Sequence, residues 1–209
     1  MDFYFIKRST PSQRALFALA EVGCAFTPHL LDPRSGETRS AAYRAVNPMG
    51  KVPSLVDGAL SLWESTAIAW YLAEKFPERG LFPETLEGRA DAMRWVAFFG
   101  GHFGPASTAY YMNTVGPRFY GNVPDEKLLE KAKAELARFL PVLDERLSRG
   151  AWLLGERLSV ADVVYAPNLA VLGMCGYDLA PWPKAAAWAG ALLARPAWKR
   201  AAELSPFEP

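Results

Sequence analysis

The sequence predicts a two-part protein, in which an α/β module of about eighty residues is followed by an all-helical module. Every segment with the composition of a β-strand lies before residue 77, and apolar residues at helical spacing dominate after residue 85. The segment 77–85, Pro-Glu-Arg-Gly-Leu-Phe-Pro-Glu-Thr, has turn-forming residues at both ends, which is typical of a linker. We therefore expect a first domain over 1–78 and a helical domain over 86–209.

The composition is that of an ordinary folded protein and excludes several partners. The chain has 209 residues, 51% of them hydrophobic and 22% charged. Its 23 basic and 22 acidic side chains leave a net charge of +1, which favours neither nucleic acid nor an anionic membrane as a partner. The most apolar stretch, 160–176, is too short to cross a bilayer. Cys24 and Cys175 lie far apart in apolar surroundings, which predicts buried free thiols in the reducing cytoplasm.

The first module is predicted to begin with a strand, a helix and a second strand. Residues 2–6 and 25–31 form apolar runs, and apolar residues at helical spacing lie between them. Pro11 suits the first turn of that helix, and Gly23 suits its C-terminal end. Two strands joined through a helix predict a parallel βαβ unit.

A loop and a hairpin are predicted next. A short helix over 41–46 precedes Asn47-Pro-Met-Gly-Lys-Val-Pro53, which is too rich in proline and glycine for regular structure. Strands over 54–56 and 59–63 are separated by Asp57-Gly58, a strong hairpin signal. These two strands are expected to pair antiparallel.

The remaining elements are predicted to be helices. They are expected over 64–76, 87–112 with a break, 125–149, 160–174, 183–194, and in a short segment from Pro196. Three glycines and a proline in 98–105 predict the break. Ser159 and Asp162 have the spacing of a capping box, so we interpret Asp162 as a structural residue.

Four segments, taken in order, resemble the cytosolic glutathione transferase family. They are Ser9-Thr-Pro-Ser-Gln-Arg14, Asn47-Pro-Met-Gly-Lys-Val-Pro53, Glu64-Ser-Thr-Ala-Ile68 and Leu158-Ser-Val-Ala-Asp162. The first segment resembles the serine-type classes, the theta, tau and bacterial nu-like ones. The resemblance implies a thioredoxin-like first domain of order βαβαββα, and a helical domain that contributes the hydrophobic substrate site. It also implies a cytoplasmic, homodimeric detoxification enzyme that activates glutathione as a thiolate for attack on a hydrophobic electrophile.

The first segment places hydroxyl groups at the start of a helix, where unpaired N–H groups and the helix dipole favour an anion. Lowering the pKa of a free thiol from about 8.5 by about two units needs ~2.7 kcal/mol of preferential thiolate stabilisation. By resemblance, Ser9 is the activating hydroxyl, and Thr10 and Ser12 are the nearest alternatives. All three could instead only cap the helix, as Ser and Thr often do.

The resemblance implies further glutathione contacts at the loop before the hairpin. Val52-Pro53 resembles the family's cis-proline turn, in which the residue before proline presents its backbone to the cysteinyl part of glutathione. Lys51 would reach the glycyl carboxylate. Thr38 stands where relatives often carry a longer polar residue for the glycyl end, and the neighbouring Arg39 could substitute. A trans proline beside a solvated lysine is the alternative.

Glu64 and Ser65 would bind the γ-glutamyl end. The Ser65 hydroxyl and the first-turn N–H groups suit its carboxylate, and the Glu64 carboxylate suits its ammonium group. Serine and glutamate are also routine capping residues at a helix start, so capping alone is the alternative.

Phe103, Tyr110 and Tyr111 are the candidates for the hydrophobic substrate site. Phe103 also shares its helical spacing with Trp95 and Phe99, which favours a core position for all three. No metal is expected, because His29 and His102 have no partner at ligand spacing.

Several functions remain open at this stage. The same site could support peroxide reduction, dehalogenation, ether cleavage or isomerisation, since these differ in the acceptor pocket. A binding or interaction module of the same fold without substantial turnover is a further alternative. A serine hydrolase is disfavoured because the sequence has no GxSxG motif, and a dithiol reductase is excluded because it has no CxxC motif.

Overall fold

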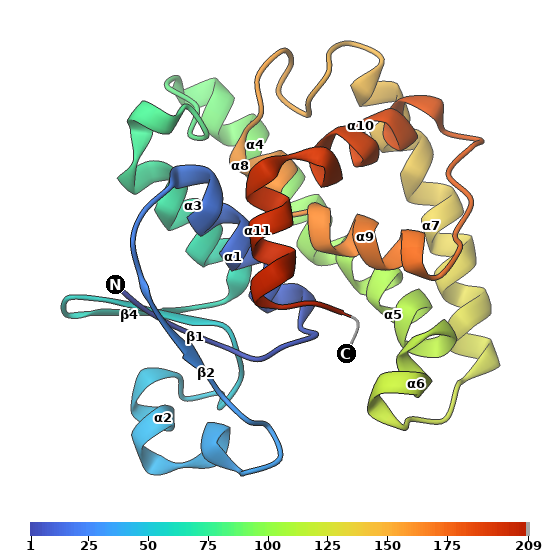
Figure 1. Ribbon diagram of the computed structural model, residues 1–209. Helices are drawn as coiled ribbons and strands as arrows, with labels where there is room; N and C mark the ends of the chain where they lie inside the picture. Colours follow the sequence, from blue (N-terminus) through green and yellow to red (C-terminus); the bar gives the residue numbers. More distant parts are fainter. Residues whose placement is uncertain (208–209) are drawn as a thin grey trace. The chain divides into compact units, whose positions relative to one another are not determined.

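The computed structural model describes residues 1–207, and the chain forms two compact units (Figure 1). One unit comprises Met1–Phe82 with Arg195–Pro209, and the other comprises Pro83–Ala194. The helical domain was expected to run to residue 209, but the C-terminal segment groups with the first unit. The reason is that its helix α11 (Pro196–Leu204) packs against helix α1 (Thr10–Val22).

The first unit is built on one mixed four-stranded sheet. Its strands are β1 (Asp2–Phe5), β2 (Thr27–Leu30), β3 (Ser54–Asp57) and β4 (Leu60–Trp63), in the spatial order β2-β1-β3-β4. β1 pairs parallel with β2 and antiparallel with β3, and β3 pairs antiparallel with β4. The predicted βαβ unit and hairpin are therefore confirmed.

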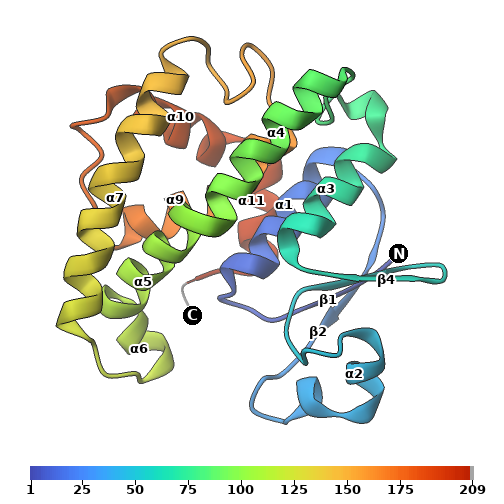
Figure 2. The ribbon, with the colours of Figure 1, turned by 180° about the vertical axis from the view of Figure 1, so that it is seen from behind.

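Helices cover both faces of this sheet. α1, α3 (Ser65–Lys75) and α11 lie on one side, and α2 (Ala41–Val46) lies on the other (Figures 1 and 2). Two short 3-10 helices, Glu37–Arg39 and Pro77–Arg79, were not predicted. Gly23 ends α1 in the left-handed region at φ 66°, as its position in the sequence predicts.

The core of the first unit is built from alternating side chains of the strands and from side chains at helical spacing. Alternation along β1 sends Phe3 and Phe5 to the same face, and both side chains are buried. α1 and α3 cross that face with apolar side chains at helical spacing, including the fully buried Leu16 and Leu72. This packing fixes the N-terminal ends of α1 and α3, which carry the predicted glutathione contacts.

The second unit is helical. Its helices are α4 (Leu86–Phe98), α5 (Gly104–Thr114), α6 (Gly116–Tyr120), α7 (Glu126–Leu147), α8 (Val160–Val163), α9 (Ala166–Met174) and α10 (Pro183–Ala194). Within the described part of this unit, only an isolated bridge between Trp152 and Gly155 has β pairing. No helix within residues 1–207 combines the length and apolarity needed to span a membrane.

Two local departures from helical geometry stand out in the second unit. The predicted break at 98–105 is a π-helical stretch, Phe99–Phe103, which joins α4 to α5. Gly104 is needed there, because a Cβ on it would lie 2.9 Å from the carbonyl oxygen of Phe99. The single helix predicted over 160–174 is wrong, since the chain breaks between α8 and α9 just before Pro167, which suits the first turn of a new helix.

Candidate active site

Ser9 occupies the N-cap position of α1. Its Oγ accepts a hydrogen bond from the backbone N–H of Ser12 at 3.2 Å, and its carbonyl accepts one from the N–H of Gln13 at 2.9 Å. The side chain is half-buried, and within residues 1–207 its hydroxyl proton meets no acceptor. A serine held in this way can donate its proton to an anion placed at the start of the helix.

The other two hydroxyl candidates differ in burial. Thr10 is the first residue of α1 and is half-buried. Ser12 is completely buried, and its Oγ has no hydrogen-bond partner in the described part of the chain. Ser9 and Thr10 are therefore the hydroxyl groups that a bound molecule could reach from solvent.

The loop before β3 has the conformation that the resemblance implies. The Val52–Pro53 peptide bond is cis. The carbonyl of Lys51 accepts hydrogen bonds from Tyr43 Oη at 2.6 Å and from Asn47 Nδ2 at 2.7 Å. These two bonds fix the backbone at Lys51 while its side chain stays exposed to solvent.

Thr38 lies directly against this loop. Gly50 adopts a φ of +60°, and a Cβ added to it would lie 2.8 Å from the carbonyl oxygen of Thr38. Only glycine allows so close an approach at that backbone angle. The structure thus brings the backbone of Thr38 against Gly50, the residue that precedes Lys51.

Glu64 stands in an unusual backbone conformation. Its φ is 70° and its ψ is 111°, and it precedes α3 without making a side-chain cap. A non-glycine residue in such a region costs about 1–3 kcal/mol, and such strain is concentrated at functional sites. The exposed carboxylate is therefore held at the start of α3 at the expense of local stability.

Ser65 follows as the first residue of α3, and a buried arginine supports it. Arg14 Nη1 donates a hydrogen bond to Ser65 Oγ at 2.7 Å. Burial lowers the pKa of Arg14 to about 9, and the carboxylate of Glu64 opposes this shift, so the guanidinium stays charged at neutral pH. The sequence reasoning assigned no role to Arg14, although a charged residue within the apolar run of α1 was a usable signal.

The three candidates for the hydrophobic substrate site lie in the second unit. Phe103 is fully buried, and its ring centroid is 5.3 Å from that of Tyr165. Tyr111 is also buried. Tyr110 is half-buried and packs edge-on against Tyr177 with centroids 5.0 Å apart. Of the three, Tyr110 has the most accessible ring.

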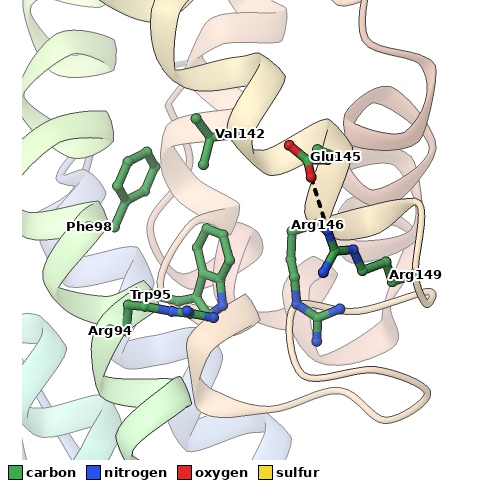
Figure 3. A pocket seen from close by; sticks show the side chains of 7 residues that line it. All are labelled: Arg94, Trp95, Phe98, Val142, Glu145, Arg146 and Arg149. Atoms are coloured by element: carbon green, nitrogen blue, oxygen red, sulfur yellow. Dashed lines mark hydrogen bonds and ion pairs between the residues drawn. The ribbon is translucent and has the colours of Figure 1, made fainter.

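A separate pocket of about 280 Å³ opens between α4 and α7 in the second unit (Figure 3). Its lining residues are Arg94, Trp95, Phe98, Val142, Glu145, Arg146 and Arg149. None of the predicted site residues lines it. Glu145 is paired with Arg149 at 3.0 Å, which leaves an apolar floor ringed by guanidinium groups.

The two histidines and the two cysteines lie outside the predicted glutathione site. His29 hydrogen-bonds to Asp2 at 2.8 Å, and the ring of His102 packs on Phe98. Within residues 1–207 no group of three potential metal ligands occurs. Cys24 and Cys175 are free as expected, but both are half-buried rather than buried.

Comparison with known families agrees with this arrangement. Residues 8–75 match the family described as glutathione S-transferase, N-terminal domain, and residues 93–196 match its C-terminal domain. The chain belongs to the glutathione S-transferase family. The first match contains Ser9, the loop before β3 and the start of α3.

Individual relatives are similar over nearly the whole chain. Glutathione S-transferase F10 of Arabidopsis thaliana is 33% identical over 199 residues, covering 90% of each chain. Glutathione S-transferase 3 of Zea mays is 30% identical and covers 100% of this chain and 96% of its own. These plant relatives are Phi-class proteins, so the expected likeness to theta, tau or nu-like classes is not confirmed.

Solved structures show the same fold. Glutathione transferase F2 of Populus trichocarpa superposes with a TM-score of 0.92 at 26% identity, covering 98% of each chain. A glutathione S-transferase-I bound with lactoylglutathione gives 0.90 at 28% identity, covering 97% of this chain and 98% of its own. The thioredoxin-like first domain and the helical second domain are therefore those of glutathione S-transferases.

Proposed function

We propose that this chain transfers glutathione to hydrophobic electrophiles and that the Ser9 hydroxyl holds the glutathione sulfur as a thiolate. The observation that carries the proposal is the Ser9 side chain, which accepts from the N–H of Ser12 and keeps its own proton to donate. Family membership supports the reaction. Relatives whose structures hold lactoylglutathione or glutathione support the cosubstrate.

The available interactions are large enough for thiolate formation. A shift of about two pKa units needs ~2.7 kcal/mol. A hydrogen bond to a charged group contributes about 1.5–3 kcal/mol, and a helix N-terminus adds about 0.3–1 kcal/mol. Ser9 and the start of α1 together match this requirement. In the reaction the thiol proton passes to water, the sulfur bonds to the electrophilic carbon, and the leaving group departs with the electron pair.

The other contacts would hold the tripeptide in an extended form. Lys51 pairs with the glycyl carboxylate, with Thr38 beside it, and the backbone of Val52 before Pro53 pairs with the cysteinyl part. At the γ-glutamyl end, Glu64 binds the ammonium group and Ser65 donates to the carboxylate. Support comes from the fixed Lys51 carbonyl and from the strained backbone at Glu64.

For the electrophile we propose an apolar surface that includes Tyr110. Phe103 and Tyr111 are buried, and they act as the packing behind it. A Tyr110→Ala variant is expected to raise the KM for an aromatic electrophile several-fold and to leave the KM for glutathione unchanged. An equal rise in the two KM values, or no rise in either, would show that Tyr110 is not part of the substrate site.

We also propose a homodimer located in the cytoplasm. Free Cys24 and Cys175 fit a reducing compartment. The open apolar floor of the α4–α7 pocket, where Val142 is 44% exposed, fits burial against a second copy. Sedimentation should then give a particle of twice the 23.0 kDa mass of one chain. The Val142→Glu substitution should lower the measured mass toward that of the monomer. A wild-type monomer would exclude the dimer.

A pair of variants tests the reaction and the assignment of Ser9. With reduced glutathione and a nitro-activated aryl chloride, Ser9→Ala should lower kcat at least about 100-fold, in line with loss of one anion-stabilising donor. The matched Thr10→Val variant should retain most activity. If the wild type binds glutathione but turns over none of a panel of aryl, peroxide and ether substrates, the chain is a binding module instead. If Thr10→Val is the inactive variant, Thr10 holds the thiolate.

A further inference from the structure

Ser205 connects the end of β1 to the first turn of α1, on either side of Ser9. Its Oγ donates a hydrogen bond to the carbonyl of Ile6 at 3.2 Å, and its own carbonyl accepts one from Gln13 Nε2 at 2.5 Å. Ile6 precedes Ser9 and Gln13 follows it in the chain. One residue near the C-terminus therefore contacts the chain on both sides of the proposed thiolate donor.

The helix that precedes Ser205, α11, is firmly attached to α1. α11 runs beside α1, with the rings of Phe17 and Trp198 edge-to-face at 5.6 Å (Figures 1 and 2). At its start, Arg195 forms a two-pronged ion pair with Glu21, in which Nη2 and Oε2 lie 2.9 Å apart. The C-terminal family match ends at residue 196, so nearly all of this helix lies beyond it.

The two bonds of the bridge differ in burial: the bond from Gln13 lies in the protein interior, and the bond to Ile6 is partly buried. Ser205 and Gln13 are completely buried, and Gln13 Oε1 has no partner within residues 1–207. β1 ends at Phe5, whose carbonyl accepts from Leu31, so the next carbonyl, that of Ile6, gains its partner from Ser205 instead of from the sheet. Because leaving a buried donor unpaired costs free energy, loss of the Gln13 bond should displace the chain after Ser9, and loss of the Ile6 bond should loosen the chain before it.

We propose that α11 and Ser205 form a strap that positions Ser9, so that Ser205 and Gln13 are positioning residues for thiolate formation. This inference rests on the proposed role of Ser9. The stabilisation of a thiolate by one hydroxyl depends steeply on its placement, and a displacement of about 1 Å can cost about 100-fold in rate. The two hydrogen bonds of Ser205 go to Ile6 and Gln13 and not to Lys51 or Ser65, so we expect the strap to act on the sulfur rather than on the binding of the peptide.

The test is the pKa of the thiol of bound glutathione, followed through the ultraviolet absorbance of the thiolate in a pH titration. Ser205→Ala and, independently, Gln13→Met should each raise this pKa by about 0.5–1 unit, which is a three- to tenfold fall in the acid dissociation constant of the bound thiol. The Kd for glutathione should stay within about twofold when calorimetry is run at about pH 5.5, where the bound thiol is mostly protonated in every variant. Because Gln13→Met leaves the serine in place, it carries the test if Ser205→Ala does not fold.

Ser107→Ala is the matched control. Ser107 is also completely buried and donates from its Oγ to a backbone carbonyl at 2.8 Å, but it lies in the second unit. It should lower thermal stability and leave the thiol pKa unchanged. If the thiol pKa rises equally in this control, the effect comes from general destabilisation and the proposed strap is wrong.

Two other results separate the strap from the proposed function. If Ser9→Ala raises the thiol pKa while Ser205→Ala and Gln13→Met do not, the strap is wrong and the role of Ser9 stands. If glutathione bound to the wild type keeps the pKa of the free thiol, both the role of Ser9 and the strap are wrong.

Discussion

Arg14 donates a hydrogen bond from Nη1 to Ser65 Oγ across 2.7 Å, and both side chains are buried. Arginine can only donate, so Ser65 accepts here and keeps its own hydroxyl proton for another acceptor. The buried guanidinium also places a positive charge behind that hydroxyl. This arrangement suits the γ-glutamyl carboxylate of glutathione at the start of α3.

The first prediction concerns this pair. Arg14→Met should weaken glutathione binding about 10- to 100-fold, because a hydrogen bond to a charged group contributes about 1.5–3 kcal/mol. Ser65→Ala should have a similar effect. Calorimetry on both variants and on the double variant checks it, since residues that act through one another give non-additive losses. Fully additive losses would show that Arg14 acts independently of Ser65.

The second prediction uses the strained backbone at Glu64. Glu64→Gly should unfold at a higher temperature than Glu64→Ala, because glycine adopts a φ of 70° freely and alanine does not. The difference should be about 1 kcal/mol in the free energy of unfolding. Both variants should bind glutathione more weakly than the wild type, since the partner of the ammonium group is gone. A Gly variant no more stable than the Ala variant would show that this backbone stores no strain.

The third prediction compares two glycines of similar conformation. Gly50 has a φ of +60° and approaches the carbonyl of Thr38, whereas Gly58 has a φ of +59° with nothing described within 4 Å of an added Cβ. Gly50→Ala should therefore cost about 1–3 kcal/mol more than Gly58→Ala. It should also weaken glutathione binding, because the loop carrying Lys51 must move. Equal losses of stability, measured by denaturant unfolding, would contradict the close approach.

The fourth prediction concerns pH and Asp162, which accepts hydrogen bonds from the N–H and Oγ of Ser159, the N–H of Leu153 and the Nε1 of Trp188. Burial raises the pKa of Asp162 to about 6, and these bonds oppose the shift. Between about pH 4 and pH 6 the folded state therefore binds more protons than the unfolded state. The contribution of this group to stability should fall by on the order of 3 kcal/mol as the pH rises through that window.

Asp162→Asn is the variant that isolates this effect. Unfolding of both proteins across the window should show the advantage of the wild type shrinking as the pH rises and levelling off above about pH 6. Above that pH the variant should still be the less stable, since an amide donor then faces donors in the network. A difference that is constant with pH would show that Asp162 does not titrate in this range.

Local signals were sufficient for most of the fold. Pro11 and Gly23 predicted the ends of α1, and Asp57-Gly58 predicted the hairpin. These features depend on backbone preferences of single residues and need no knowledge of distant contacts. The cis bond at Val52–Pro53 was different, because base rates favour trans and only the family resemblance predicted it.

Features that depend on distant contacts were missed. The attachment of α11 to α1 rests on contacts such as Trp198 with Phe17, and helical spacing cannot say which surface a helix covers. The role of Arg14 could not be predicted from its own segment, since its partner Ser65 is far along the chain. The burial of Ser12 likewise depends on which side of α1 meets the core.

The central claim is that Ser9 holds glutathione as a thiolate. It is tested most directly by the pH titration of the ultraviolet absorbance of glutathione bound to the wild type and to Ser9→Ala. We expect a thiol pKa about two units below the free value of about 8.5 in the wild type, and a return toward that value in the variant. A bound thiol with an unshifted pKa in the wild type, or an equally lowered pKa in Ser9→Ala, would contradict it.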